Sequence, residues 1–255
     1  MTLAVKRTNK VLKNEKIAEG IYDMWLEAKD MASFAKPGQF VSLYCNDGSR
    51  LLPRPISICE TDQSTESLRL LYRVVGKGTE EFSKLRPGDM IDCMGPLGNG
   101  FTLEGTRALI IGGGIGIPPL LELAKRLSCE KTIVLGFRDE TFLVKDFEKY
   151  GSTYVATESG NLGTKGNVLD AIRKHRLTGD IIYACGPAPM LRGIKEFAME
   201  SKIKAQLSLE ERMACGIGAC LACVCKSVKT DPHTNVNNKR ICKEGPVFYA
   251  EEVIL

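Results

Sequence analysis

Short apolar runs separated by turn residues fill the first hundred positions of the chain. The runs lie at residues 39–44, 56–59, 68–75 and 90–94, and Gly, Pro or polar residues bound each of them. Several short strands between turn signals are typical of a small antiparallel barrel. We therefore expect residues 1–102 to form a first domain of this kind.

Near residue 103 the pattern changes to strands that alternate with helices. The apolar run 107–111 leads directly into the sequence GGGIGIPP, and the leucines of 120–127 recur at helical spacing. Apolar runs at 132–137, 153–157 and 180–184 then alternate with helical stretches at 142–150, 168–175 and 190–199. This alternation predicts a parallel sheet with helices on both faces, over residues 103–205.

The final stretch, residues 206–255, is a compact segment rich in cysteine. It is too short to bury a core of its own, so we expect an inorganic group to organise it. The fold class expected for the whole chain is therefore a multidomain β plus α/β protein. It combines an N-terminal antiparallel β-barrel, a parallel α/β domain and a small C-terminal domain.

Composition narrows the classes of function. Apolar residues make up 44% and charged residues 26%, as in ordinary globular proteins. Lys and Arg number 35 against 31 Asp and Glu, without a basic stripe, which argues against nucleic-acid binding. The chain shows neither a secretory signal nor an apolar run long enough to cross a bilayer, so we expect a cytoplasmic protein with no membrane partner. Thiols stay reduced there, and clustered cysteines then indicate metal or redox chemistry.

Four of the ten cysteines lie within MACGIGACLACVC, residues 213–225. The first three of these are spaced C-x4-C-x2-C, and another cysteine, Cys242, follows after a longer loop. This is the plant-type spacing of [2Fe–2S] ligands. The candidate metal ligands are Cys215, Cys220, Cys223 and Cys242. Cys225 lies one residue beyond a ligand and should point away from the cluster if the segment is extended. A zinc knuckle or a set of reduced thiols remains the alternative, although zinc sites favour two C-x2-C pairs and only one is present.

Two segments of the expected barrel carry groups suited to a flavin nucleotide. In RPISI, residues 54–58, Arg54 could hold a pyrophosphate and Ser57 could donate to an isoalloxazine edge. The sequence LYR at 71–73 lies on the next run, and GKGT at 76–79 offers backbone N–H groups, a hydroxyl and a cation to phosphate. A surface Arg beside a strand-initiating Pro explains RPISI equally well on its own.

The α/β segment carries two candidate nucleotide turns. Gly112, Gly113, Gly114 and Gly116 stand between a strand and a helix, where phosphates could approach a bare backbone. The G-x-G-x-x-G fingerprint fails, because Ile117 occupies the place of its last glycine. The turn at Cys185 and Gly186 should lie at the carboxyl edge of the sheet, unless it only ends a strand.

Taken in order, RPISI, GKGT, GGGIGIPP, CGPAPM and the cysteine spacing resemble the ferredoxin–NADP reductase superfamily. Within it the chain is most similar to the family of electron transfer subunits of bacterial type B dihydroorotate dehydrogenase. The most specific parts are SLEERMACGIGACLACVCK and the later CKEGPVF. The resemblance implies FAD on the barrel, NAD on the α/β domain and a [2Fe–2S] cluster held by the four cysteines.

The resemblance also implies roles for individual residues. Those expected to line FAD are Arg54, Pro55, Ile56, Ser57, Leu71, Tyr72, Arg73, Gly78 and Thr79. Cys185 and Glu210 are expected near the nicotinamide and the flavin, and no residue is expected to act as a catalytic acid or base. Arg138 and Asp139 give opposite indications for NADP and NAD, and the family favours NAD. His175 and His233 are expected to be a helix-surface and a loop residue.

The function implied is electron transfer in pyrimidine biosynthesis. An FMN-containing dihydroorotate dehydrogenase catalytic subunit would be the partner, in a two-plus-two heterotetramer. Electrons would pass from its FMN through the [2Fe–2S] cluster and FAD to NAD+. One rival is the flavin and iron–sulfur subunit of an NAD(P)H:ferredoxin oxidoreductase or sulfide dehydrogenase. A rival of another class is a zinc-stabilised, non-enzymatic binding module.

Overall fold

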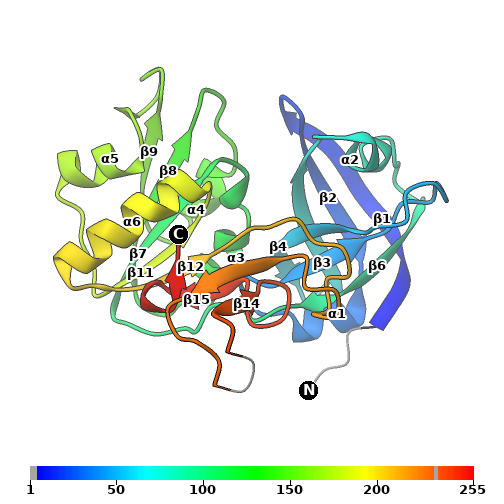
Figure 1. Cartoon of the computed structure of the whole chain (residues 1–255). Coiled ribbons are helices and arrows are strands. Elements are labelled where there is room, and N and C mark those ends of the chain that lie inside the picture. Colours follow the sequence, from blue (N-terminus) through cyan, green and yellow to red (C-terminus); the bar gives the residue numbers. More distant parts are fainter. Residues whose placement is uncertain (1–4, 233–234) are drawn as a thin grey trace.

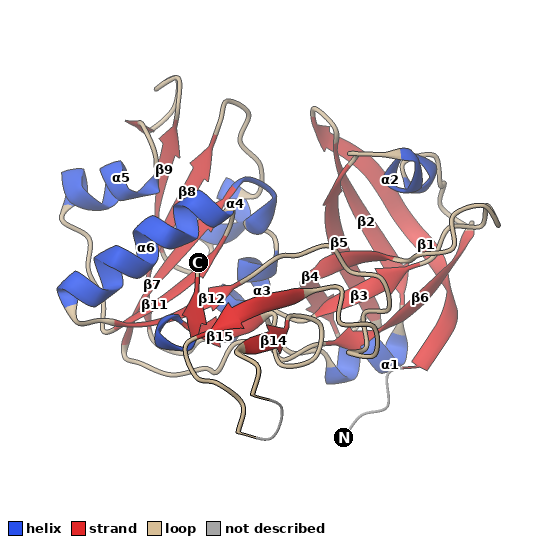
Figure 2. Cartoon of the chain, viewed as in Figure 1, coloured by secondary structure: helices blue, strands red, loops and turns tan. Residues whose placement is uncertain are grey.

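The computed structural model describes residues 5–232 and 235–255, so His233 lies outside the described residues. A β-barrel and an α/β layer stand side by side, and the C-terminal segment runs across one side of both (Figures 1 and 2). The arrangement confirms the expected fold class. No helix within the described part of the chain is long and apolar enough to cross a membrane.

Six antiparallel strands close the barrel in the order β1-β2-β5-β4-β3-β6. They are β1 (Val5–Ala18), β2 (Ile21–Glu27), β3 (Phe40–Leu43), β4 (Arg54–Asp62), β5 (Ser67–Arg73) and β6 (Met90–Leu97). Two short helices accompany them, α1 (Lys29–Phe34) and α2 (Lys77–Phe82). Because side chains alternate along a strand, each strand presents one face to the barrel interior and one face outward.

The outward face of the barrel is also buried at β3 and β5. On β3, Val41 and Leu43 fill the barrel, whereas Phe40 packs outward among residues of the C-terminal segment. On β5, Tyr72 lies inside the barrel and Leu71 faces the α/β layer. The barrel wall is therefore the common surface on which the other two parts of the molecule rest.

A seven-stranded sheet forms the α/β layer, in the order β10-β9-β8-β7-β11-β12-β15. Its strands are β7 (Arg107–Gly113), β8 (Glu130–Phe137), β9 (Ser152–Thr157), β10 (Thr164–Lys165), β11 (Ile181–Cys185), β12 (Lys204–Ser208) and β15 (Val247–Tyr249). All pair in parallel except β15, which is antiparallel to β12. The parallel sheet expected from the alternation of strands and helices is thus confirmed, with one antiparallel strand added at its edge.

Helices cover both faces of this sheet. They are α3 (Pro119–Arg126), α4 (Val144–Glu148), α5 (Val168–His175) and α6 (Ala188–Ser201), with a short 3-10 turn η1 (Gly114–Gly116) before α3. Along β7, Leu109 and Ile111 pack in the core that includes α5 and α6. Ala108 and Ile110 pack in the core that includes α3. The uninterrupted apolar character of β7 follows from burial on both sides.

The cysteine-rich segment is joined to both neighbouring parts. It forms a three-stranded sheet of β13 (Val224–Ser227), β14 (Asn238–Arg240) and β16 (Val253–Ile254), with a turn η2 (Ala250–Glu252). Its remaining strand, β15, belongs to the large sheet, and the backbone N–H of Asn99 donates to the carbonyl of Gly245 at 2.6 Å. The expected boundary at residue 206 accordingly falls inside β12.

One buried hydroxyl ties down the linker between barrel and sheet. Tyr183 on β11 is fully buried, and its hydroxyl accepts a hydrogen bond from the backbone N–H of Glu104 at 2.9 Å. The same hydroxyl lies 3.0 Å from the carbonyl of Thr102, to which it donates. Burial raises the pKa of Tyr183 to about 12, so the phenol keeps its proton at neutral pH.

We expect Tyr183→Phe to lower the free energy of unfolding by about 1–3 kcal/mol, because it leaves buried linker groups without a partner. Urea denaturation followed by circular dichroism measures the change. Tyr150→Phe is the matched control, since the structure records no hydrogen bond from that hydroxyl to a described residue. Equal stability of the two variants would contradict the role assigned to Tyr183.

Candidate functional site

Arg54 and the GKGT turn meet at one end of the barrel. A Cβ atom built on Gly78 would lie 2.4 Å from Nε of Arg54, so the guanidinium rests directly on the first turn of α2. The hydroxyl of Thr79 is already hydrogen-bonded at the start of that helix, where it accepts from the backbone N–H of Val75 at 3.0 Å. An Arg fork beside free helix N–H groups suits a pyrophosphate.

Register separates the other flavin candidates of β4 into two sets. Pro55 pairs with Ser42 and Ser57 pairs with Phe40, and directly opposite residues share a face of a sheet. Pro55 and Ser57 are therefore on the outer face with Phe40. The side chain of Ile56 packs against the barrel core instead.

The candidates on β5 also divide between the two faces. Leu71 points outward and Arg73 is exposed, whereas the Tyr72 ring lies inside the barrel. The Tyr72 hydroxyl donates to Oδ1 of Asn14 at 3.1 Å, and the ring stacks on Tyr22 with 5.8 Å between centroids. Burial raises the pKa of Tyr72 above its usual range. Only the backbone of Tyr72 is thus free to contact a ligand outside the barrel.

The two glycine turns of the α/β layer come together at the carboxyl edge of the sheet. Cys185 at the end of β11 pairs with Gly112 at the end of β7. A Cβ atom on Gly116 would lie 2.6 Å from Cα of Gly186, so only glycine allows the two turns to touch. The N-terminus of α3 opens at the same edge, as dinucleotide binding requires.

Cys185 pairs with Ser208 across β11 and β12, and Glu210 lies two residues beyond Ser208. Burial, and to a lesser extent the nearby Glu210, raise the pKa of the Cys185 thiol to about 12, so the group is neutral at physiological pH. Glu210 is exposed just beyond the end of β12. The pair can contact a ligand at the sheet edge without adding a thiolate charge there.

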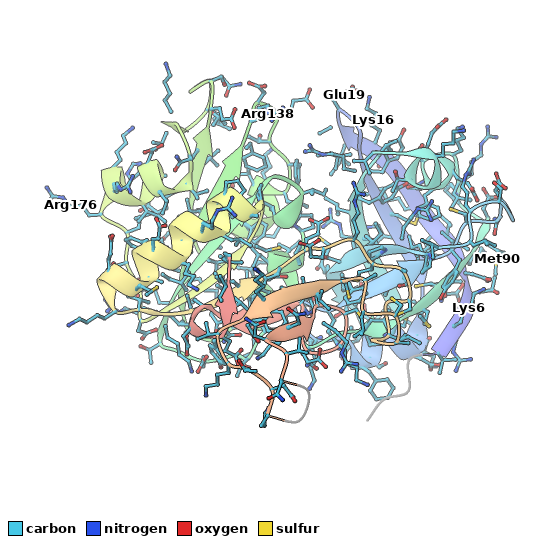
Figure 3. All side chains as sticks on the ribbon, in the orientation of Figure 1. Lys6, Lys16, Glu19, Met90, Arg138 and Arg176 are labelled. Carbon is cyan, nitrogen blue, oxygen red and sulfur yellow. The ribbon has the colours of Figure 1, made fainter. Side chains whose placement is uncertain are left out.

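Loops of the barrel and the sheet line an open, shallow cavity of about 640 Å³ at the rim of the molecule. Asp139 lines it, and the backbone N–H of Glu19 donates to Oε2 of Glu140 across it at 2.7 Å. Arg138 is 84% exposed and reaches Glu158 at 3.9 Å (Figure 3). Of the two residues with opposite indications for the nucleotide, only Asp139 lines the cavity.

The four candidate ligands are arranged as two pairs. Cys215 interacts with Cys220, and the backbone N–H of Cys242 donates to Sγ of Cys223 at 3.4 Å. Among the described residues, no three His, Cys, Asp or Glu side chains gather around one point as a single metal ion requires. Two neighbouring pairs of thiolates are what the two irons of a [2Fe–2S] cluster need.

The loop that follows Cys215 favours the thiolate form of this residue. Burial raises the pKa of Cys215, but hydrogen bonds from the backbone N–H groups of Ile217 and Ala219 and from Cys220 outweigh it and lower the pKa to about 6. The backbone N–H of Ala219 donates to Sγ of Cys215 at 3.3 Å. Cys220 is exposed. Cys225, by contrast, packs against the core, and burial raises the pKa of its thiol.

This loop rests on the outer face of β3, a contact that the sequence analysis missed. A Cβ atom on Gly216 would lie 2.9 Å from Oγ of Ser42 and 4.0 Å from the Phe40 ring. The Ser42 hydroxyl is buried and has no hydrogen-bond partner among the described residues. A buried unpaired hydroxyl is typical of a surface that a bound group completes. The sequence feature that could have indicated this contact is Ser42, a polar residue within the otherwise apolar run QFVSLY.

The chain is similar to several known proteins. Residues 210–254 match the family model described as the iron–sulfur cluster binding domain of dihydroorotate dehydrogenase B. The dihydroorotate dehydrogenase B (NAD+) electron transfer subunit of Caldanaerobacter subterraneus subsp. tengcongensis is 46% identical, with 98% of each chain covered. That of Geobacillus sp. is 44% identical, with 96% of this chain and 97% of the relative covered.

A solved structure of an NADH-dependent reduced ferredoxin-NADP oxidoreductase, studied for flavin-based electron bifurcation, is also similar. It has a TM-score of 0.87 and 33% identity, and the match covers 96% of this chain and 89% of the other.

We expect Gly216→Ala to lower the cluster content, because the new methyl group would collide with Ser42 and the residue has a φ of +70°. Iron and acid-labile sulfide per chain, measured after anaerobic preparation, report the loss. Adding Ser42→Ala should restore part of it by removing Oγ. Gly48→Ala is the control, since nothing lies within 4 Å of a Cβ atom there. Full cluster content in Gly216→Ala would contradict this contact.

Proposed function

The chain belongs to the family of dihydroorotate dehydrogenase B (NAD+) electron transfer subunits, and we propose which of its residues bind each cofactor. It is the electron-transferring, NAD+-reducing subunit of an oxidoreductase complex of pyrimidine biosynthesis. It carries FAD and a [2Fe–2S] cluster and binds NAD. FAD supplies the exchange between single electrons at the cluster and the hydride of the nicotinamide.

The flavin residues we propose lie on one wall and one end of the barrel. Pro55 and Ser57 would contact the isoalloxazine from the outer face of β4, and Arg54 with Gly78 would hold the pyrophosphate. Ile56, Leu71, Tyr72, Arg73 and Thr79 would shape this site through backbone contacts and packing. For Tyr72 and Thr79 this follows from hydroxyls that are already bonded to Asn14 and to the start of α2.

One observation carries the proposed electron path. The cysteine loop lies on Ser42 and Phe40 of β3, and these residues pair with Pro55 and Ser57 of β4. Neighbouring strands are about 4.8 Å apart, so the loop that would hold the cluster borders the wall that would hold the flavin. A flavin and a cluster held there would be close enough for electrons to pass without a further carrier.

The proposed nicotinamide site is the carboxyl edge of the large sheet. Gly112, Gly113, Gly114 and Gly116 would admit the dinucleotide phosphates, and Cys185, Gly186 and Glu210 would border the nicotinamide. The cavity lined by Asp139 favours NAD over NADP, because a carboxylate accepts a ribose hydroxyl and repels a 2′-phosphate. No residue here needs to act as an acid or a base.

An electron transfer subunit implies a catalytic partner subunit. We propose that this partner contains FMN, oxidises dihydroorotate and docks over the exposed Cys220, in a two-plus-two heterotetramer. Ile217 and Leu221 support the docking surface, since they flank Cys220 and are 49% and 63% exposed. None of the ten cysteines, all of which lie among the described residues, forms a disulfide, which favours the cytoplasm as the location.

The two rival functions have less support than this proposal. An NAD(P)H:ferredoxin oxidoreductase subunit is supported by the solved structure at 33% identity, against 44–46% for the dihydroorotate dehydrogenase subunits. A zinc-stabilised binding module is disfavoured by the pairing of the cysteines in twos.

We expect Cys220→Ser to remove the iron–sulfur absorbance and to stop NAD+ reduction that depends on the catalytic partner. NADH oxidation by an artificial acceptor through FAD should persist, because it bypasses the cluster. Cys225→Ser is the control and should keep both properties. If dihydroorotate-coupled NAD+ reduction survived Cys220→Ser intact, the proposed path would be wrong.

We expect Leu221→Glu to weaken the partner complex by about tenfold, because it replaces apolar contact area with a charge that must lose its water. Titrating the variant with the catalytic subunit and recording NAD+ reduction measures the change. NADH oxidation by an artificial acceptor should not change. Met199→Glu on α6, where the side chain is 67% exposed, is the control for added surface charge. Equal affinity of the two variants would place the docking surface elsewhere.

A further inference from the structure

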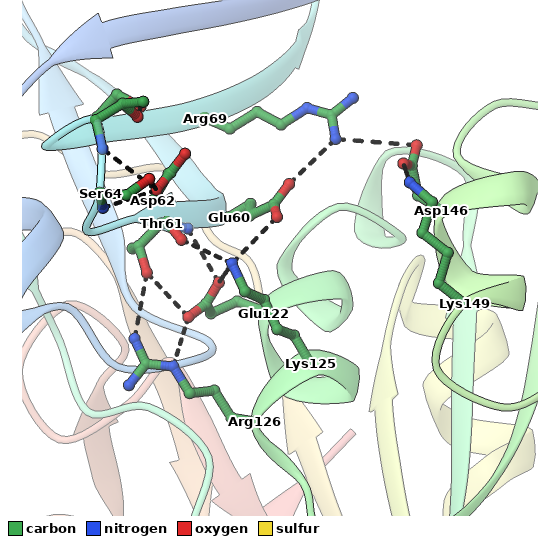
Figure 4. A network of polar contacts seen from close by, with 12 residues as sticks. Glu60, Thr61, Asp62, Ser64, Arg69, Glu122, Lys125, Arg126, Asp146 and Lys149 are labelled. Atoms are coloured by element: carbon green, nitrogen blue, oxygen red, sulfur yellow. Dashed lines mark hydrogen bonds and ion pairs between the residues drawn. The ribbon is translucent and has the colours of Figure 1, made fainter.

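A network of polar contacts joins the barrel to the α/β layer at Glu122 (Figure 4). Glu122 lies on α3 and is fully buried. Its carboxylate accepts two hydrogen bonds from Thr61 on β4, one from the backbone N–H at 3.0 Å and one from Oγ1 at 2.9 Å. A buried carboxylate without such partners would be strongly disfavoured, so this contact is specific.

Two cations on the same helix complete the contact. Nε of Arg126 donates to Glu122 at 2.6 Å, and its Nη2 donates to Oγ1 of Thr61 at 3.2 Å. Nζ of Lys125 donates to the carbonyl of Thr61 at 2.8 Å and to Glu60 at 3.2 Å. The backbone N–H, the carbonyl and the hydroxyl of Thr61 are therefore all bonded to α3.

A second set of contacts extends the network. Arg69 on β5 makes a double contact with Asp23 at 2.9 and 3.0 Å and reaches Glu60 at 3.3 Å. It also lies 3.9 Å from Asp146 on α4. We call the contacts of Glu122, Thr61, Lys125 and Arg126 the Glu122 network, and these contacts of Arg69 lie beside it.

The elements joined by the Glu122 network are those that would carry the two reactants. Strand β4 begins with Arg54–Ser57, the proposed flavin contacts, and reaches Thr61 four residues later. Helix α3 begins at Pro119, immediately after the glycine turn proposed for the dinucleotide, and reaches Glu122 within its first turn. Helix α3 is continuous over this length, and β4 pairs with β5 on both sides of a register shift between Ile58 and Glu60. A shift at Thr61 and Glu122 therefore displaces both ligand sites relative to each other.

We propose that Glu122 is a positioning residue for hydride transfer, because it fixes α3 on β4 and thereby the approach of the nicotinamide to the flavin. The inference rests on the proposed function. The reaction is NADH + H+ + FAD ⇌ NAD+ + FADH2, in which one hydride moves between the two rings and one proton is exchanged with solvent. Such transfers depend steeply on geometry, and a misplacement of about 1 Å costs about a hundredfold in rate.

The test uses the full chain loaded with FAD and cluster, without the catalytic subunit. Reduction of FAD by NADH is followed in a stopped-flow instrument, with NADH and with NADH deuterated at the transferred position. In Glu122→Ala we expect the limiting rate to fall by about tenfold or more. The isotope effect should also become more temperature-dependent, because donor and acceptor are held less closely. The FAD content, the FAD reduction potential and the cluster spectrum should stay as in the unaltered chain.

Two further variants keep the test decisive if Glu122→Ala folds poorly. Glu122→Gln retains one acceptor oxygen but places an NH2 donor where the second oxygen accepted, so it should recover only part of the rate. Thr61→Val removes only the hydroxyl and should give an intermediate rate with a similar isotope signature. Asp92→Asn is the control. Asp92 on β6 accepts from Thr8 Oγ1 at 2.7 Å and from Lys6 at 2.8 Å, and both partners lie on β1 of the barrel.

Unchanged rates and isotope effects in both Glu122→Ala and Thr61→Val would overturn the proposal. A rate that fell only in proportion to lost FAD would do the same, since it would assign Glu122 a role in stability alone. Failure of the proposed function is distinguishable, because FAD in the unaltered chain would then not be reduced by NADH at all.

Discussion

The contact between the cysteine loop and the outer face of β3 is the constraint on which the rest of the molecule depends. Gly216 lies so close to Ser42 that no other residue fits without a shift. Since β3 pairs with β4 in a fixed register, this contact also determines where the loop stands relative to Pro55 and Ser57. In the proposed arrangement, the outer surface of the barrel would therefore position both the flavin and the cluster.

The interface between the barrel and the α/β layer would position the nicotinamide, and both apolar packing and hydrogen bonds stabilise it. Leu71 and Cys59 of the barrel pack with Ile117 and Leu120 of the α/β layer, and burial of this apolar area holds the two parts together. Apolar packing is non-directional and leaves the angle between the parts open. The hydrogen bonds of the buried Glu122 are directional and select one orientation.

Prediction from the sequence succeeded where the physical cause is local. Turn residues between short apolar runs indicated the barrel, and alternating periods indicated the parallel sheet, because each pattern reflects the burial of a single element. It failed where faces had to be assigned. The string LYR could not show that Tyr72 lies inside the barrel with its hydroxyl on Asn14, since a shift of one residue reverses every side chain of a strand.

Sequence patterns were enough for the fold class, the family and the spacing of three of the four candidate cluster ligands, because these depend on neighbours along the chain. The contacts of Arg54 with Gly78, of Gly216 with Ser42 and of Glu122 with Thr61 emerge only when the chain is folded. Such contacts join segments far apart in the sequence. They follow from strand register and from the packing of helix on strand, which the whole fold fixes at once.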